Sequence, residues 1–238
     1  MKRIRPGLIV ILGLALLAAG CDDTPPPPKP KPEEPSKRVE VGKNVWLDVQ
    51  GDKRRVRVNG YVCLREGQLE QLVTRKNTKE HEAIIAVDAD ARKIHEALLL
   101  AGAEPGTPVR FVPKYQPAAG QTIKVTLQYE DNGRLVTVPG QNWVKDTKTG
   151  KEMAVDWVFA GSQLVDNPLD PDHPKTYLAN DGDVICVSNF DTAMMDLPVE
   201  SSQKNSELEF EAWTERIPPR DTPVTIILDP APGPKKDK

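Results

Sequence analysis

The sequence predicts an α+β fold, a mainly antiparallel β-sheet domain with one principal helix, and three observations predict it. Residues 122–129 alternate polar and apolar side chains, the period of a half-buried antiparallel strand. Asp131-Asn132-Gly133 follows, and 135–138 is again strand-like, so Asn-Gly marks a hairpin turn. Only 90–101 stands out with helical spacing. A single helix on an antiparallel sheet is an α+β arrangement.

The first 21 residues are typical of a bacterial lipoprotein signal. Three basic residues lie within 2–5, and 8–20 is an apolar run that is too short to cross a bilayer comfortably. The run ends in Leu-Ala-Ala-Gly before Cys21, a pattern that resembles a lipobox. We therefore expect cleavage after residue 20 and lipid on Cys21. The alternative is an ordinary secretory signal in which this cysteine is incidental.

The remaining chain divides by composition into three parts. Residues 21–38 are rich in proline and predict an extended, semi-rigid tether. Residues 39–228 predict a single globular domain, and 229–238 predict a disordered tail. Gly- or Pro-containing turns separate many of the short strand-like runs within the domain. These runs lie at 44–49, 55–64, 69–74, 83–87, 109–112, 122–129, 135–138, 154–159, 184–188, 207–213 and 224–228.

Residues 90–101 carry the signals of a helix at both ends. Asp90 is a suitable N-cap, and Gly102 is suited to the position after the C-cap. Ile94, Ala97, Leu98 and Ala101 recur at helical spacing, so we expect them to form the buried stripe.

Charge restricts the partners. Removing residues 1–20, which hold three basic and no acidic residues, changes the net charge from −3 to −6. An acidic chain argues against nucleic acid, which requires a concentrated basic surface. No later segment is apolar enough to span a membrane, so the lipid on Cys21 would be the only anchor. An envelope protein or a small ligand remains as the partner.

Two cysteines remain once Cys21 is assigned to lipid. Cys63 and Cys186 both lie in apolar, strand-like contexts. Outside the cytoplasm an even pair favours a disulfide. Two separate buried thiols and metal ligation are the alternatives, whereas an iron–sulfur cluster held by four cysteines is excluded by count.

The histidines supply the candidate chemistry. His81 lies in the polar cluster Thr-Lys-Glu-His-Glu at 78–82, and His95 lies on the flank of the predicted helix. Histidine suits acid–base chemistry and transition-metal binding. His81, Glu82 and His95 are therefore candidate catalytic residues, and the two histidines are candidate metal ligands. The alternative is a charged loop and a helix histidine bonded to backbone. His173 lies in a loop-like Pro-Asp-His-Pro sequence.

Other motifs are weak. Ser162 lacks the Gly-x-Ser-x-Gly frame of a nucleophile elbow, and no dinucleotide or nucleotide-phosphate motif is present. The Asx-rich loops at 166–172 and 180–183 lack the spacing of an EF-hand and match ordinary turns. No recognised catalytic motif indicates an enzyme.

Five segments together resemble the YdjY-like domain family, which is common in planctomycete cell-envelope proteins. They are G-Y-V-C-L-R-E-G at 60–67, T-K-E-H-E at 78–82, I-H-E-A-L-L-L-A-G at 94–102, D-W-V-F-A-G-S at 156–162 and G-D-V-I-C-V-S-N-F at 182–190. The resemblance covers nearly all of 43–228. It implies a cell-envelope protein and modestly favours a site at the polar cluster and helix histidine, but it supplies no reaction.

Together these observations predict a lipid-anchored accessory or binding protein of the cell envelope that faces the periplasm. The alternative is a metal- or His-dependent hydrolase or redox enzyme centred on His81, Glu82 and His95. The membrane of residence stays open between inner and outer, although Asp22 resembles the signal that retains lipoproteins on the inner membrane in enterobacteria.

Overall fold

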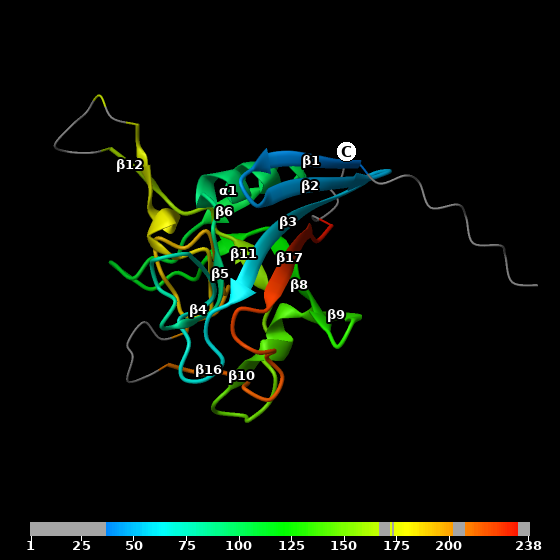
Figure 1. Cartoon of the computed structure of the whole chain (residues 1–238). Helices are drawn as coiled ribbons and strands as arrows, with labels where there is room; N and C mark the ends of the chain where they lie inside the picture. The colour runs from blue at the N-terminus through cyan, green and yellow to red at the C-terminus, as the bar shows by residue number, and fades with distance from the viewer. Residues whose placement is uncertain (1–36, 167–171, 173, 202–207, 233–238) are drawn as a thin grey trace, which may run out of the picture. The chain divides into compact units, whose positions relative to one another are not determined.

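The computed structural model describes residues 37–166, 172, 174–201 and 208–232, and their dominant feature is a closed β-barrel (Figure 1). Eight strands form the ring. In ring order they are β3 (Lys53–Val62), β17 (Pro223–Pro230), β8 (Thr122–Asp131), β11 (Trp157–Phe159), β15 (Met195–Asp196), β14 (Ile185–Cys186), β4 (Gln71–Arg75) and β5 (Ala83–Val87). The ring closes because β5 pairs back onto β3.

The predicted α+β fold class is therefore wrong. Of the described residues, 45% are in strands and 10% are helical, and the main sheet closes on itself instead of remaining open. Closure depends on one short contact, in which Tyr61 pairs with Ala86 and Val62 pairs with Ile85. Gly60 permits it, because a Cβ there would lie 2.6 Å from the carbonyl oxygen of Ala86.

Further strands extend from the ring or form small separate sheets. β1 (Lys37–Gly42) and β2 (Val45–Gln50) continue the sheet from β3, and β9 (Arg134–Pro139) pairs with β8. The small sheets join β6 (Pro105–Thr107) to β7 (Ala119–Gly120), β10 (Val144–Asp146) to β16 (Phe210–Ala212), and β12 (Leu164–Val165) to β13 (Thr176–Tyr177). Short 3-10 turns lie at η1 (Gly140–Trp143) and η2 (Leu178–Asp181).

The predicted strand at 109–112 is not formed as a strand. Its only pairing is an isolated bridge between Arg110 and Gln116. In contrast, the alternating segment at 122–129 is β8, and the turn after it leads into β9 as predicted.

In the described residues the single α-helix is α1 (Ala91–Leu100), and its predicted caps are confirmed, with Gly102 in the left-handed conformation after its end. The Asp90 side chain accepts a hydrogen bond from the backbone N–H of Arg92, which satisfies a free donor of the first turn. Asn180 adds a second contact, because its side chain donates to Asp90 and accepts from the N–H of Ala91. The start of α1 is thus fixed to η2.

Apolar side chains fill the barrel. Ile94 of α1 and residues of β3, β4, β14 and β17 surround a void of about 10 Å³. Such a void is at the lower limit for one water molecule. The barrel interior around this void is therefore a packed core. Among the described residues, no helix has the length and apolar character needed to cross a bilayer.

Candidate functional site

The structure places the two candidate histidines in separate surroundings. The His81 side chain is 76% exposed, and its Nε2 lies 3.7 Å from a carboxylate oxygen of Glu82. It precedes β5, whose five extended residues span about 17 Å, whereas His95 follows β5 on α1. Within the described part of the chain, the contacts of the two imidazoles share no residue, so the structure does not bring His95 together with His81 and Glu82.

His95 is instead part of a half-buried hydrogen-bond network. Its Nδ1 lies 2.8 Å from the hydroxyl of Tyr177, which donates to the carbonyl oxygen of Gly161 at 3.0 Å. The imidazole also packs edge-on against Phe159. Burial lowers the pKa of His95, with a smaller opposing effect from the Gly161 carbonyl. The neutral imidazole therefore holds α1 against the 159–161 segment.

The polar cluster at 78–82 gains a partner that the sequence did not indicate. Glu70 lies within hydrogen-bonding reach of Glu82, and burial together with the neighbouring carboxylate raises the pKa of Glu70 to about 7. Two carboxyl groups in such proximity share a proton, because both cannot ionise cheaply. The backbone explains the meeting, since the N–H groups of Glu70 and Gln71 both donate to the Glu82 carbonyl.

Asp183 links this cluster to the barrel wall. It is buried, and its carboxylate accepts from Lys79 at 2.9 Å, Gln71 at 3.2 Å and Thr192 at 2.5 Å. The Lys79 ammonium also lies over the ring of Phe190. The Gln71 amide nitrogen is engaged by Asp183, whereas its Oε1 is buried without a hydrogen-bond partner among the described residues. No set of three or more His, Cys, Asp or Glu in the described ranges is arranged to hold a metal ion.

The candidate disulfide is not formed. Cys63 and Cys186 are both free and buried. Cys63 follows β3 and Cys186 ends β14, and the ring places β5 and β4 between them. Neighbouring strands are about 4.8 Å apart, so the separation exceeds the reach of a disulfide. Burial raises the pKa of Cys63 to about 12 and also raises the pKa of Cys186, so both thiols stay protonated.

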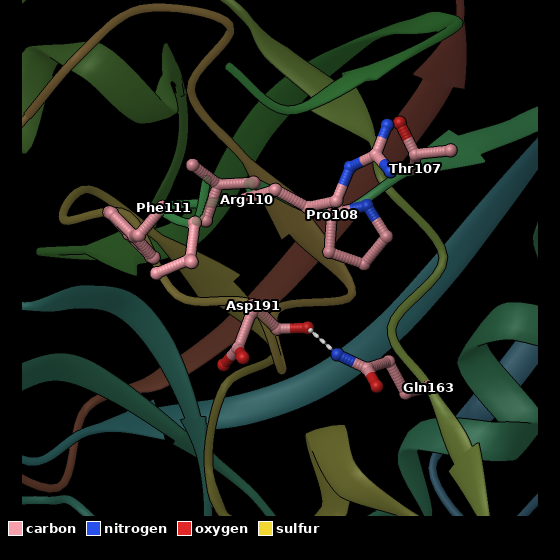
Figure 2. A pocket seen from close by; sticks show the side chains of 8 residues that line it. Thr107, Pro108, Arg110, Phe111, Gln163 and Asp191 are labelled. Carbon is pink, nitrogen blue, oxygen red and sulfur yellow. Dashed lines mark hydrogen bonds between the residues drawn. The ribbon is translucent and has the colours of Figure 1, made fainter. Parts of the chain in front are cut away.

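A surface cleft is the feature best suited to bind a ligand (Figure 2). Its volume is about 520 Å³, within the range of about 300–1,000 Å³ typical of small-ligand sites. We name it the Arg110 cleft. It is lined by Thr107, Pro108, Val109, Arg110, Phe111, Val112, Gln163 and Asp191.

One wall of the Arg110 cleft is fixed by hydrogen bonds. The Gln163 amide donates to the Asp191 carbonyl at 2.8 Å, the dashed line in Figure 2. Beside it, the Ser162 hydroxyl donates to the Thr192 carbonyl at 2.6 Å. Ser162 also accepts from the N–H of Ala179. These bonds join two loops into one wall, and they engage Ser162 as a structural residue.

The facing wall rests on a small apolar cluster. Val109 is fully buried and packs with Ala118, Val158 and Ala160, apart from the barrel core. Beyond it, Phe111 and Val112 are 37% and 83% exposed. This wall is therefore anchored at Val109 and open to solvent at its far end.

Charged groups of opposite sign line the Arg110 cleft on its two walls. Figure 2 shows Arg110 beside Thr107 and Pro108, with Asp191 and Gln163 on the other side. Among the described residues, neither the Arg110 guanidinium nor the Asp191 carboxylate has a side-chain partner. No motif marked these residues, because the cleft joins three segments that are distant in sequence. The unpaired Arg110 and Asp191 side chains could be identified only from the fold.

Some predicted features lie outside the described residues. Cys21, Asp22, the 1–20 signal and most of the 21–38 tether are among them, as is His173. Lipid attachment and localisation therefore remain predictions.

The fold and the site define a β-barrel domain with a packed interior and a cleft on its outer surface. The chain belongs to the YdjY domain family, whose model matches residues 47–229. The match covers the whole eight-strand ring except Pro230 at the end of β17, and it leaves out β1 and the start of β2. It confirms the resemblance drawn from the sequence. Comparisons with curated proteins and with solved structures found no match.

Proposed function

We propose that this protein is a lipid-anchored accessory protein of the cell envelope that binds a ligand or partner in the Arg110 cleft. One observation carries the binding function: the cleft is large enough for a ligand and presents an unpaired guanidinium, an unpaired carboxylate and an exposed aromatic ring. Binding sites combine an apolar surface with a few polar groups in this way.

The anchoring part of the proposal is supported by the N-terminal sequence alone. A basic start, an apolar run and small residues before Cys21 match a lipoprotein signal, and a proline-rich segment follows. Two or three acyl chains would hold the protein firmly on a membrane, with the barrel facing the periplasm.

The arrangement of the histidines favours binding over catalysis at the predicted centre. His81 faces solvent and contacts Glu82, whereas His95 is bonded to Tyr177. A general acid and base must both reach one substrate. These side chains have no common cavity among the pockets described, so we do not propose the enzyme centred on them.

Anchoring is tested by the substitution Cys21→Ser. Cells expressing the full chain are fed radiolabelled palmitate, and the protein is partitioned between detergent and water. We expect label and detergent partitioning in the wild type and neither in Cys21→Ser. Cys63→Ser is the matched control and should behave as wild type. Label that persists in Cys21→Ser would contradict the proposal.

Binding is tested with a photo-crosslinking amino acid at position 112 in living cells. Val112 is 83% exposed on the cleft wall, and Leu135, 72% exposed on β9, is the matched control. We expect a discrete crosslinked species from position 112 that is absent from position 135. Equal adducts from both positions, or none from either, would refute the cleft as the binding site.

A further inference from the structure

The strand β1 (Lys37–Gly42) is an edge strand with a free outer side. It pairs with β2 along one side, and no strand in the described ranges pairs with the other (Figure 1). α1 contacts β1, β2 and β3, so it covers one face of this part of the sheet. The first four residues of β1 are nevertheless exposed. An unpaired edge of this kind is a template for another strand.

The register of the sheet shows which residues of β1 turn their backbone groups outward. The Asn44 carbonyl accepts a backbone hydrogen bond from β3 at 3.0 Å, so Asn44 faces β3. Backbone groups along an antiparallel strand alternate between its two sides. Leu47, three residues further on, therefore faces β1, where it pairs with Val39. Val39 thus directs its N–H and C=O groups toward β2, and Arg38 and Glu40 direct theirs to the free edge.

The two outward-facing residues carry opposite charges. The Arg38 guanidinium binds Asp48 of β2 at 2.8 Å and is still 55% exposed. Glu40 is exposed, and within the described part of the chain its carboxylate has no partner. Residues two apart in a strand share a face, so a cation and an anion lie side by side along the free edge. Charges on an edge hinder pairing with unrelated strands, but a strand with both signs can complement a second copy of itself.

We propose that the protein forms a homodimer in which β1 pairs antiparallel with β1 of a second copy, about a two-fold axis at Val39. In this register Arg38 of each copy lies opposite Glu40 of the other. Both residues turn their backbone groups outward, so each pair can exchange two backbone hydrogen bonds. A register centred on Arg38 or on Glu40 would instead place like charges opposite each other, which is destabilising. This inference goes beyond the proposed binding function and uses a different surface.

The surroundings of the edge fit the same register. Val39 is 39% exposed, and it would lie opposite Val39 of the second copy in a non-hydrogen-bonded pair, the kind in which side chains are closer. On the other face, Asp48 already bridges Arg38 and Arg57. Glu40 of the second copy would extend this row of alternating charges across the edge.

The first test is a disulfide across the two-fold axis. The mature chain carrying Cys21→Ser and Val39→Cys is oxidised with copper phenanthroline, and covalent dimer is followed on non-reducing gels. The Cα atoms of a non-hydrogen-bonded pair are about 4.5 Å apart, which suits a disulfide. Cys63 and Cys186 are buried and do not interfere.

The matched control for this crosslink is Leu135→Cys in the same background, because Leu135 is an exposed residue of β9, which pairs only with β8. We expect covalent dimer to form at least about tenfold faster from Val39→Cys, because pairing of β1 raises the effective concentration of its thiols. Equal rates from the two variants would overturn the inference.

The second test exchanges the charges. Glu40→Lys and Arg38→Glu each oppose like charges in a homodimer, so each alone should raise the dissociation constant of the dimer by about tenfold or more. An equal mixture of the two variants restores opposite charges at both pairs and should form a heterodimer. Sedimentation equilibrium measures the masses. Glu66→Lys, the same charge change at an exposed position outside β1, should dimerise as wild type.

Thermal unfolding checks that each variant is folded, because Arg38→Glu also removes the ion pair with Asp48. Faster crosslinking at position 39 together with a heterodimer from the mixed variants would establish the inference. A wild-type chain that stays monomeric at millimolar concentration, or a dimer that survives both single variants, would overturn it. Neither result bears on the Arg110 cleft, which is tested separately from position 112.

Discussion

Replacing Glu70 by glutamine should remove a pH-dependent loss of stability. Glu70 is 7% exposed, and burial followed by the Glu82 carboxylate raises its pKa from 4.5 to about 7. Lys79 opposes the rise and Asp183 adds to it. The Glu70→Gln amide donates a hydrogen bond to Glu82 without needing a proton, so the pair is satisfied at every pH.

The direction follows from proton binding. Between the unfolded value of 4.5 and the folded value of about 7, the folded state of Glu70 holds a proton that the unfolded chain has released. Stability therefore falls as pH rises through this window and is fully retained only below the unfolded value. At 1.36 kcal/mol per pKa unit, the loss between pH 5 and pH 8 is about 2 to 3 kcal/mol.

The assay is urea unfolding of the mature chain followed by tryptophan fluorescence at pH 5, 6, 7 and 8. We expect the difference in unfolding free energy between Glu70→Gln and wild type to shift in favour of the variant by about 2 to 3 kcal/mol across this range. Glu66→Gln, an exposed neighbour, is the control and should track wild type. Parallel curves for Glu70→Gln and wild type would refute the shared proton.

Three further predictions follow from local geometry. Gly120→Ala should lower the free energy of unfolding by about 3 kcal/mol or more, because a Cβ at φ +153° would lie 2.1 Å from the Phe159 carbonyl oxygen in β11. Gly133→Ala, which has open space around it, should lower it by about 1 kcal/mol. Equal losses in thermal unfolding would contradict the placement of β7. Burial lowers the pKa of His95, so the unfolded chain binds more protons and wild-type stability should fall as pH drops below 6.5. His95→Asn should flatten this fall, whereas His81→Asn, at an exposed position, should not. Identical slopes of stability against pH in all three proteins would refute the buried network. Cys63 and Cys186 should react with an alkylating reagent only after the protein is denatured, and no reductant should be needed. A mass of the mature chain lower by two protons would instead show the disulfide that the strand order forbids.

Local pattern was sufficient to locate many elements. The alternation at 122–129 and the Asn-Gly turn identified β8 and the hairpin to β9, and Asp90 located the start of α1. These signals depend on neighbours in sequence, so one segment contains all the information. The predicted strand at 109–112 was wrong, because these residues line the wall of the Arg110 cleft and form only a single isolated bridge.

Long-range pairing was not readable. Barrel closure depends on two residue pairs between β3 and β5, and no local pattern distinguishes them from an open edge. The same holds for the polar cluster at 78–82. Its charged sequence identified Glu82, but the contacts of Glu70 with Glu82 and of Asp183 with Lys79 depend on the order of the strands. The predicted disulfide between Cys63 and Cys186 was wrong for the same reason, because two strands lie between these residues.

The most direct test of binding in the Arg110 cleft is photo-crosslinking from position 112 in living cells, with position 135 on β9 as the control. We expect a discrete crosslinked species from position 112 that position 135 does not give. Equal adducts from both positions, or none from either, would contradict the account.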